Sequence, residues 1–173
     1  MKVYVASSYT NAALLDTMIG ALRAVGHVAH DFRAGGRPPN LVFTRDRMDS
    51  PSEYVEALAS PTAREQFEFD RAALAAADSL VLVLPSGLDS HLEAGWAIGR
   101  GLPVIGFLHG SWKPSLMHKL IPVFVDNIPS LLVALARVVP RDVAATGDVT
   151  PPALRSRPLS QHANTEVSDH GRR

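Results

Sequence analysis

The chain has 173 residues, of which 46% are hydrophobic and 20% are charged, as in an ordinary globular protein with one sizeable core. Its 17 Lys and Arg residues balance its 17 Asp and Glu residues, so no net positive charge favours a nucleic-acid polymer or an anionic membrane. The absence of cysteine excludes disulfides, thiolate metal sites and cysteine nucleophiles. The expected partner is therefore a small molecule.

The sequence also predicts the compartment of the protein and whether it needs a metal or a cofactor. The first residues, MKVYVASSY, contain no apolar segment long enough for a signal peptide, and no apolar run approaches the length of a membrane span. These features predict a cytoplasmic protein with no membrane partner. No group of His, Asp and Glu has metal-site spacing, and no glycine motif fits a dinucleotide or a Walker-type phosphate loop. No metal and no cofactor is expected.

Short apolar runs alternate with amphipathic segments in the first half of the chain. The predicted elements are a strand at 2–6, a helix that ends at Gly26, a strand at 27–32, a short helix at 50–59 and a helix at 62–77. Thr10 or Asn11 fits the N-cap of the first helix.

Asp70 is the first candidate for chemistry, because it shares the apolar face of the helix at 62–77 with Phe67 and Leu74. Burying a carboxylate is costly unless it is hydrogen-bonded, paired or functional. Arg64 and Arg71 are possible ion-pair partners, which would make Asp70 a structural residue.

Residues 33–49 form a long segment without periodicity. Such segments are often functional loops. This one carries four arginines and one aromatic residue: Arg33, Arg37, Arg45, Arg47 and Phe43. Either it is a lid that supplies cations and a stacking ring to a ligand, or it is a solvated surface loop.

The second half is organised around one strand–helix–strand unit, with predicted strands at 80–84 and 103–108 and a helix at 90–99 between them. A weak helix at 116–120, a strand at 122–126 and a helix at 128–139 with Asn127 as its N-cap follow. Residues 140–173 contain four prolines and few apolar residues, and we predict a disordered tail after a single domain at 1–139.

Glu93 is the carboxylate at the corner of the central unit. Ser90-His91-Leu92-Glu93 fits a capping box, in which Glu93 would bond back to the helix N-terminus. The functional alternative is a carboxylate at the floor of a ligand crevice, where it would act as a nucleophile. Around it, Ser86 and Asp89 suit hydroxyl or phosphate binding or a simple turn, and His91 suits a general acid or an exposed residue.

Five strands that alternate with helices predict a flavodoxin-like or Rossmann-like doubly wound parallel sheet, in the order 2-1-3-4-5. In this order the turn after strand one and the turn after strand three border the same crevice. The sequence therefore predicts that residues 7–11 and 85–93 form one site.

Four blocks of sequence, in order, resemble the nucleoside 2-deoxyribosyltransferase-like superfamily, which includes the 2'-deoxynucleoside 5'-monophosphate N-glycosidases: KVYVASSY, HDFR, EFDRAALAAADSLVLVLPSG and HLEAGWAIGRGLPV. The resemblance covers about residues 2–108 and implies cleavage of a nucleoside's N-glycosidic bond. Glu93, in an E-x-G helix start, would attack the anomeric carbon, Asp70 would assist the departing base, and Tyr9 would orient the nucleophile. The glycosyl group would pass to another base or to water, and a homodimer or larger homo-oligomer is implied.

The resemblance and the predicted crevice together define an expected set of substrate contacts. This set is Ser7, Ser8, Asp31, Arg33, Phe43, Ser86, Gly87, Asp89, Ser90 and His91. The turn at 7–11 lacks the Gly- and Arg-rich pattern of the phosphate-accepting hydrolases, which favours an unphosphorylated nucleoside. Ser86, Ser90 and the lid arginines leave a phosphate open.

Two other readings stay open. A phosphoribohydrolase of the lysine-decarboxylase-like group would carry a PGGxGTxxE turn, which PSGLDSHLE matches only in its Pro, one Gly and the Glu. A non-catalytic nucleotide-binding sensor could share the fold, because a fold does not determine a function. Release of base that depends on Glu93 would separate an enzyme from a sensor.

Overall fold

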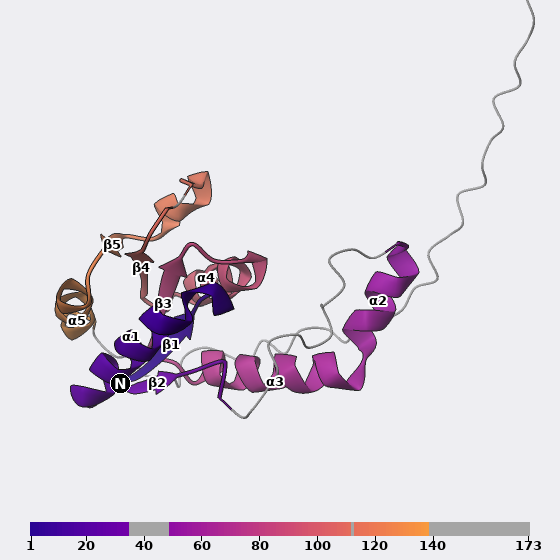
Figure 1. Cartoon of the computed structure of the whole chain (residues 1–173), viewed down its shortest axis with the longest axis horizontal. Helices are drawn as coiled ribbons and strands as arrows, with labels where there is room; N and C mark the ends of the chain where they lie inside the picture. Colours follow the sequence, from indigo (N-terminus) through magenta and orange to yellow (C-terminus); the bar gives the residue numbers. More distant parts are fainter. Residues whose placement is uncertain (35–48, 112, 139–173) are drawn as a thin grey trace, which may run out of the picture. The chain divides into compact units, whose positions relative to one another are not determined.

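A computed structural model describes residues 1–34, 49–111 and 113–138, and the account that follows concerns these residues. They form five strands, five α-helices and two short 3-10 helices (Figure 1). The strands are β1 (Lys2–Ala6), β2 (Val28–His30), β3 (Ser79–Leu84), β4 (Val104–Leu108) and β5 (Val123–Val125). The helices are η1 (Tyr9–Asn11), α1 (Ala12–Ala24), α2 (Pro51–Ala59), α3 (Pro61–Ala75), α4 (Leu88–Gly99), η2 (Leu116–Leu120) and α5 (Ile128–Ala136).

The strands form one parallel sheet in the order β2-β1-β3-β4-β5, which confirms the predicted topology. β3 lies at its centre, with Val3 of β1 paired to Ser79 and Val104 of β4 paired to Leu80. All six residues of β3 are buried, as expected for a strand covered on both faces.

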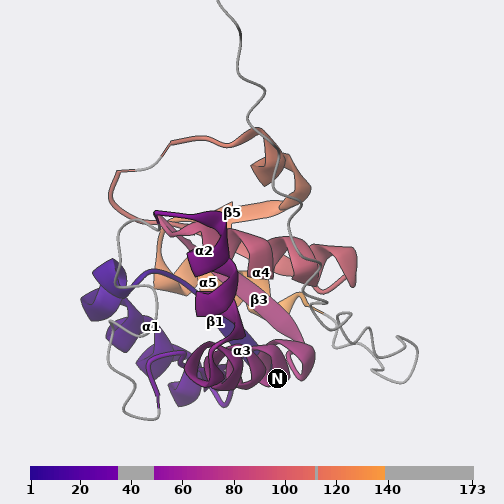
Figure 2. The same ribbon diagram turned by 90° about the vertical axis from the view of Figure 1, so that its right-hand side faces the viewer.

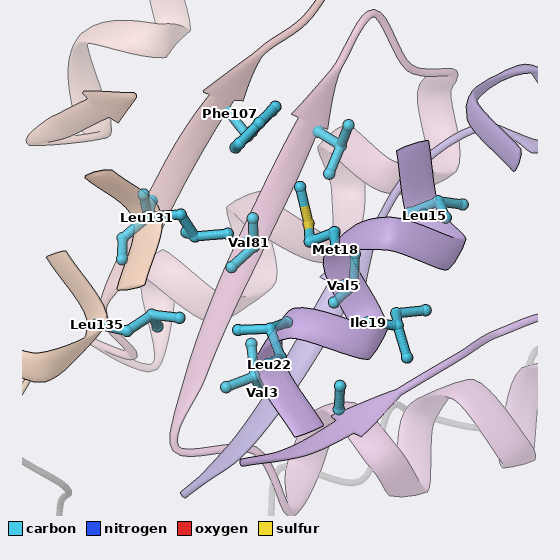
Figure 3. Close-up of a cluster of buried hydrophobic side chains, with 13 residues drawn as sticks. Val3, Val5, Leu15, Met18, Ile19, Leu22, Val81, Phe107, Leu131 and Leu135 are labelled. Carbon is cyan, nitrogen blue, oxygen red and sulfur yellow. The ribbon is translucent and has the colours of Figure 1, made fainter. Parts of the chain in front are cut away.

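Helices cover both faces of the sheet, and the alternation of side chains along each strand divides the core in two. Val3, Val5, Val81 and Val83 face α1 and α5, and Figure 3 shows this cluster around Met18, Leu22 and Leu131. The residues between them face α4 and the end of α3: Tyr4, Ala6, Leu80, Leu82 and Leu84. Figures 1 and 2 show α1 and α5 on one side of the strands and α4 on the other.

Only the C-terminal part of α3 packs against the sheet. Leu74 of the predicted apolar face is buried there, together with Ala77, but Phe67 of the same face is 52% exposed. Phe67 lies about two turns before Leu74, and α2, which precedes α3, has no buried residue. The apolar face of α3 is therefore longer than the part that packs against the sheet, and Phe67 lies on the uncovered part.

Several predicted helix ends are confirmed. Ser50 caps α2, Asn127 caps α5, and Gly26 follows the last turn of α1 with a φ of 85° that suits glycine. Asn11 occupies the N-cap position of α1 without a side-chain cap bond, and its Nδ2 donates instead to Ser7 Oγ and to the Pro85 carbonyl. The predicted tail at 140–173 lies outside the described residues.

The predicted capping box is wrong. α4 begins at Leu88 with Gly87 at the N-cap position, so Ser90 lies inside the helix and cannot cap it. Glu93 is consequently in the second turn, and its side chain does not bond to the helix N-terminus. No helix of the described part is long and apolar enough to cross a membrane.

Candidate active site

Hydrogen bonds tie the loop after β1 to the loop after β3, at the carboxyl ends of these neighbouring strands. Asn11 Nδ2 donates to the Pro85 carbonyl at 2.8 Å and to Ser7 Oγ at 3.1 Å. Ser90 Oγ of α4 donates to the Ser7 carbonyl at 3.1 Å. This is the switch point of the sheet, where doubly wound folds bind ligands. The structure thus brings Ser7 and Ser90 together as predicted, and both hold the loops in place.

Glu93 lies next to this junction and accepts a hydrogen bond from Tyr4. The Tyr4 hydroxyl is 2.7 Å from Glu93 Oε1, and Tyr4 itself is 1% exposed within β1. The sequence analysis missed Tyr4. The available signal was its place in a buried strand, since a buried phenol needs a hydrogen-bond partner.

Tyr9, which was expected to orient Glu93, has a different environment. Its ring meets Phe32 edge-on, with centres 5.0 Å apart and planes at 83°. The structure therefore places Tyr4, and not Tyr9, in hydrogen-bond contact with Glu93.

The surroundings of Glu93 favour its neutral form. Burial raises the pKa of Glu93 to about 7, the negative charges of Asp70 and Asp89 act in the same direction, and the Tyr4 hydrogen bond opposes them. Burial and the carboxylate of Glu93 also raise the pKa of Tyr4, so Tyr4 remains a hydroxyl donor. A buried carboxyl group whose pKa is strongly raised is a candidate for a catalytic residue.

The side chain of Asp70 is 21% exposed and contacts a histidine. His30 Nε2, at the end of β2, is 3.5 Å from Asp70 Oδ1, while the Arg71 proposed as a partner pairs with Glu68. The His30 ring also stacks on Tyr4, with centres 5.0 Å apart and planes at 18°. Tyr4, His30, Asp70 and Glu93 thus form one connected group, in which His30 was not predicted.

A cavity of about 330 Å³ opens beside α4 at the same edge of the sheet. It is lined by Leu84, Pro85, Ser86, His91, Ser111, Lys113, Ser115 and His118. Among the described residues its lining has one cation, Lys113, and no carboxylate, and the buried Ser86 hydroxyl has no hydrogen-bond partner. Such a lining suits an anion. Ser86 and His91 were predicted, whereas Lys113 and His118 were missed because they lie between β4 and β5 in a stretch without a motif.

Two histidines meet at this cavity. His91 Nδ1 is 2.8 Å from the Gly87 carbonyl oxygen, and His91 Nε2 is 3.2 Å from His118 Nε2. The two ring planes are inclined by 14°. The pair joins α4 to η2, which lies between β4 and β5 in the sequence.

The remaining predicted residues lie apart or have structural partners. Arg33 forms ion pairs with Asp31 and Asp16, so its charge is already compensated. Ser8 caps η1, and Gly87 is at the N-cap of α4. Phe43 and the arginines at 37, 45 and 47 lie outside the described residues. Within residues 1–34, 49–111 and 113–138 no group of three or more His, Asp or Glu could hold a metal ion.

No protein-family model and no curated protein matches the sequence. Among solved structures, the chain is similar to the 2-deoxyribosyltransferase of Bacillus psychrosaccharolyticus, with a TM-score of 0.54 and 16% identity over 82% of this chain and 99% of that chain. A CMP N-glycosidase of Clostridium botulinum, BcmB, has a TM-score of 0.44 and 16% identity over 79% of this chain and 99% of that chain. The first likeness confirms, at the level of the fold, the resemblance found in the sequence.

Proposed function

We propose that the protein is an enzyme that cleaves the N-glycosidic bond of a nucleoside or nucleotide, with Glu93 as its nucleophile. The observation that carries this proposal is the hydrogen bond of 2.7 Å between buried Tyr4 and Glu93 at the switch point of the sheet. The similar 2-deoxyribosyltransferase structure supports the same reaction class.

The geometry suits a reaction in two displacements. In the first, an ionised oxygen of Glu93 forms a bond to the anomeric carbon while the bond from that carbon to the base nitrogen breaks, and the electron pair leaves with the base. The Tyr4 hydroxyl holds Oε1, and no hydrogen bond within the described part of the chain engages Oε2, which is the oxygen available for attack. Asp70 would assist the departing base by hydrogen bonding or by supplying its proton.

In the second displacement, water or another base attacks the anomeric carbon and releases the Glu93 carboxylate. Transfer requires that an acceptor base enters the crevice before water does, and hydrolysis requires the reverse. The proposal includes a homodimer, which the sequence resemblance implies, in the cytoplasm, which the lack of a signal-peptide pattern favours. The mass of the protein in solution would test the dimer.

A phosphorylated substrate is a second candidate, favoured by the cavity beside α4. The orphan hydroxyl of Ser86 and the ammonium of Lys113 border a space without carboxylates, as a 5'-phosphate requires. A nucleoside 5'-monophosphate would then be the preferred substrate, in contrast to the unphosphorylated nucleoside that the turn at residues 7–11 favours.

The test is a chromatographic assay with deoxynucleosides, ribonucleosides and their monophosphates, each with and without a second free base. We expect the wild type to release base and Glu93→Ala to release none. A new nucleoside in the presence of acceptor would identify a transferase, and release without exchange would identify a hydrolase. Tight binding of nucleotide with no release from any substrate would instead indicate a sensor and would overturn the proposal.

A further inference from the structure

His30 has well-defined contacts on two sides. Its side chain is 17% exposed, and its ring packs between Tyr4, with centres 5.0 Å apart, and Phe69, with centres 5.1 Å apart. Tyr4 belongs to the neighbouring strand β1 and Phe69 to helix α3, so the imidazole is held between the sheet and this helix. A ring fixed on both sides presents its nitrogen atoms in a defined direction.

The nitrogen that is presented is Nε2, and it meets Asp70. The separation of 3.5 Å between His30 Nε2 and Asp70 Oδ1 corresponds to a long hydrogen bond and to a close electrostatic contact. Both side chains are largely shielded from water. Phe69 precedes Asp70 in α3, so the ring contact and the polar contact fix the same turn of this helix.

We propose that His30 is a positioning residue, which holds Asp70 at the departing base while its ring supports Tyr4, the partner of Glu93. This inference rests on the proposed function, because it assigns His30 to the step in which Asp70 acts. His30 itself touches no reacting atom in this scheme. Its Nε2–H would donate to Oδ1 and stop the carboxylate from rotating, which keeps Oδ2 available to the base.

A pair of substitutions separates this role from simple packing. His30→Phe keeps a ring between Tyr4 and Phe69 but removes Nε2. His30→Gln removes the ring but returns an amide N–H close to the position of Nε2. His27→Phe, just before β2, is the matched control, because His27 has no contact with Tyr4 or Asp70.

The experiment compares kcat and KM for a nucleoside with those for a 4-nitrophenyl glycoside of the same sugar, whose leaving group departs without a proton. We expect His30→Phe to lower kcat on the nucleoside about tenfold or more, as when a general acid is displaced, with KM unchanged. On the nitrophenyl glycoside kcat should stay at the wild-type value. His30→Gln should recover much of the loss, and His27→Phe should match the wild type.

Equal losses on both substrates, or no loss on either, would overturn the inference. A double-mutant cycle on Tm tests the same contact without an activity assay. It compares the Tm values of His30→Phe, Asp70→Asn and the double variant with that of the wild type. Non-additive shifts would support the contact, and additive shifts would overturn it. A wild type that cleaves no substrate would overturn the proposed function, and the Tm cycle would still decide on His30.

Discussion

At the scale of single residues, the proposed chemistry depends on the groups that shift the pKa of Glu93. Burial and two neighbouring carboxylates raise its pKa to about 7, and the Tyr4 hydrogen bond limits that rise. The neutral form of Glu93 is therefore favoured near neutral pH more than in an ordinary glutamate. In the proposed reaction the nucleophile must be ionised to attack, so Tyr4 would set the pH range of activity.

Tyr4→Phe removes the hydroxyl and keeps the ring. The carboxylate of Glu93 then loses its donor, so the pKa of Glu93 should rise above about 7 and the acid limb of the pH–rate profile should move to higher pH. We expect kcat at pH 7 to fall by about tenfold or more, with a smaller loss at pH 9, in steady-state assays. Tyr9→Phe should leave the profile in place. The opposite result would return the orienting role to Tyr9.

Glu93→Gln should stabilise the fold at alkaline pH. The pKa of Glu93 is raised from 4.5 in the unfolded reference to about 7, so the folded state holds its proton more tightly. The resulting stability is present below pH 4.5 and is lost as the pH rises to 7. Removing the buried charge should therefore add about 1–3 kcal/mol to the free energy of unfolding at pH 8 and little at pH 4.5, measured by urea denaturation. A loss of stability at pH 8 would contradict this account.

At the scale of elements, the contact between α4 and η2 fixes two histidine tautomers. The Gly87 carbonyl can only accept a hydrogen bond, so His91 Nδ1 carries a proton. When the ring is neutral, His91 Nε2 has no proton and can only accept. His118 Nε2 must then be the donor to His91. Nitrogen NMR at pH 8 should show the Nδ1–H form for His91 and the Nε2–H form for His118. The reverse assignment, or rapid averaging of both, would contradict this contact.

The same contact should weaken in acid. Burial and the nearby His91 lower the pKa of His118 below its ordinary value of 6.5, so the folded state favours the neutral ring. This contribution to stability is present above pH 6.5 and is lost as the pH falls below it. A second proton on the pair would place two N–H groups against each other.

The elements were largely predictable, since β3 is an unbroken apolar run and α1 has a regular apolar face. The residues of the candidate site were harder to predict. The capping box failed because Ser90 and Glu93 have the right spacing, while the helix begins earlier, at Leu88. Tyr4 was missed because its partner lies 89 residues away, and a strand pattern does not identify partners across the fold. His30 was missed for the same reason, because its partner Asp70 lies 40 residues away.

At the scale of the whole molecule, the order of the strands makes the site. β1 and β3 are adjacent although α1, β2, α2 and α3 separate them in sequence, so Tyr4 reaches Glu93 and Asn11 reaches Pro85. The order was predictable from the alternation of strands and helices, which is typical of doubly wound sheets. The positions of side chains within the crevice required the register of the sheet, in which Tyr4 is paired with Leu80.

Both buried clusters consist of residues from Met1 to Val138, within a compact unit that spans Met1–Val143. The sequence after residue 143 is rich in proline and poor in apolar side chains, and we predict that it adds nothing to the core. A chain that ends at Val143 should therefore unfold within about 2 °C of the full chain and keep its kcat and KM. Leu131→Ala, at a fully buried position, is the control for sensitivity. This substitution should lower the free energy of unfolding by about 2–5 kcal/mol. A fall in Tm as large as that of Leu131→Ala, or a rise in KM, would assign the C-terminal segment a part in the fold or in the site.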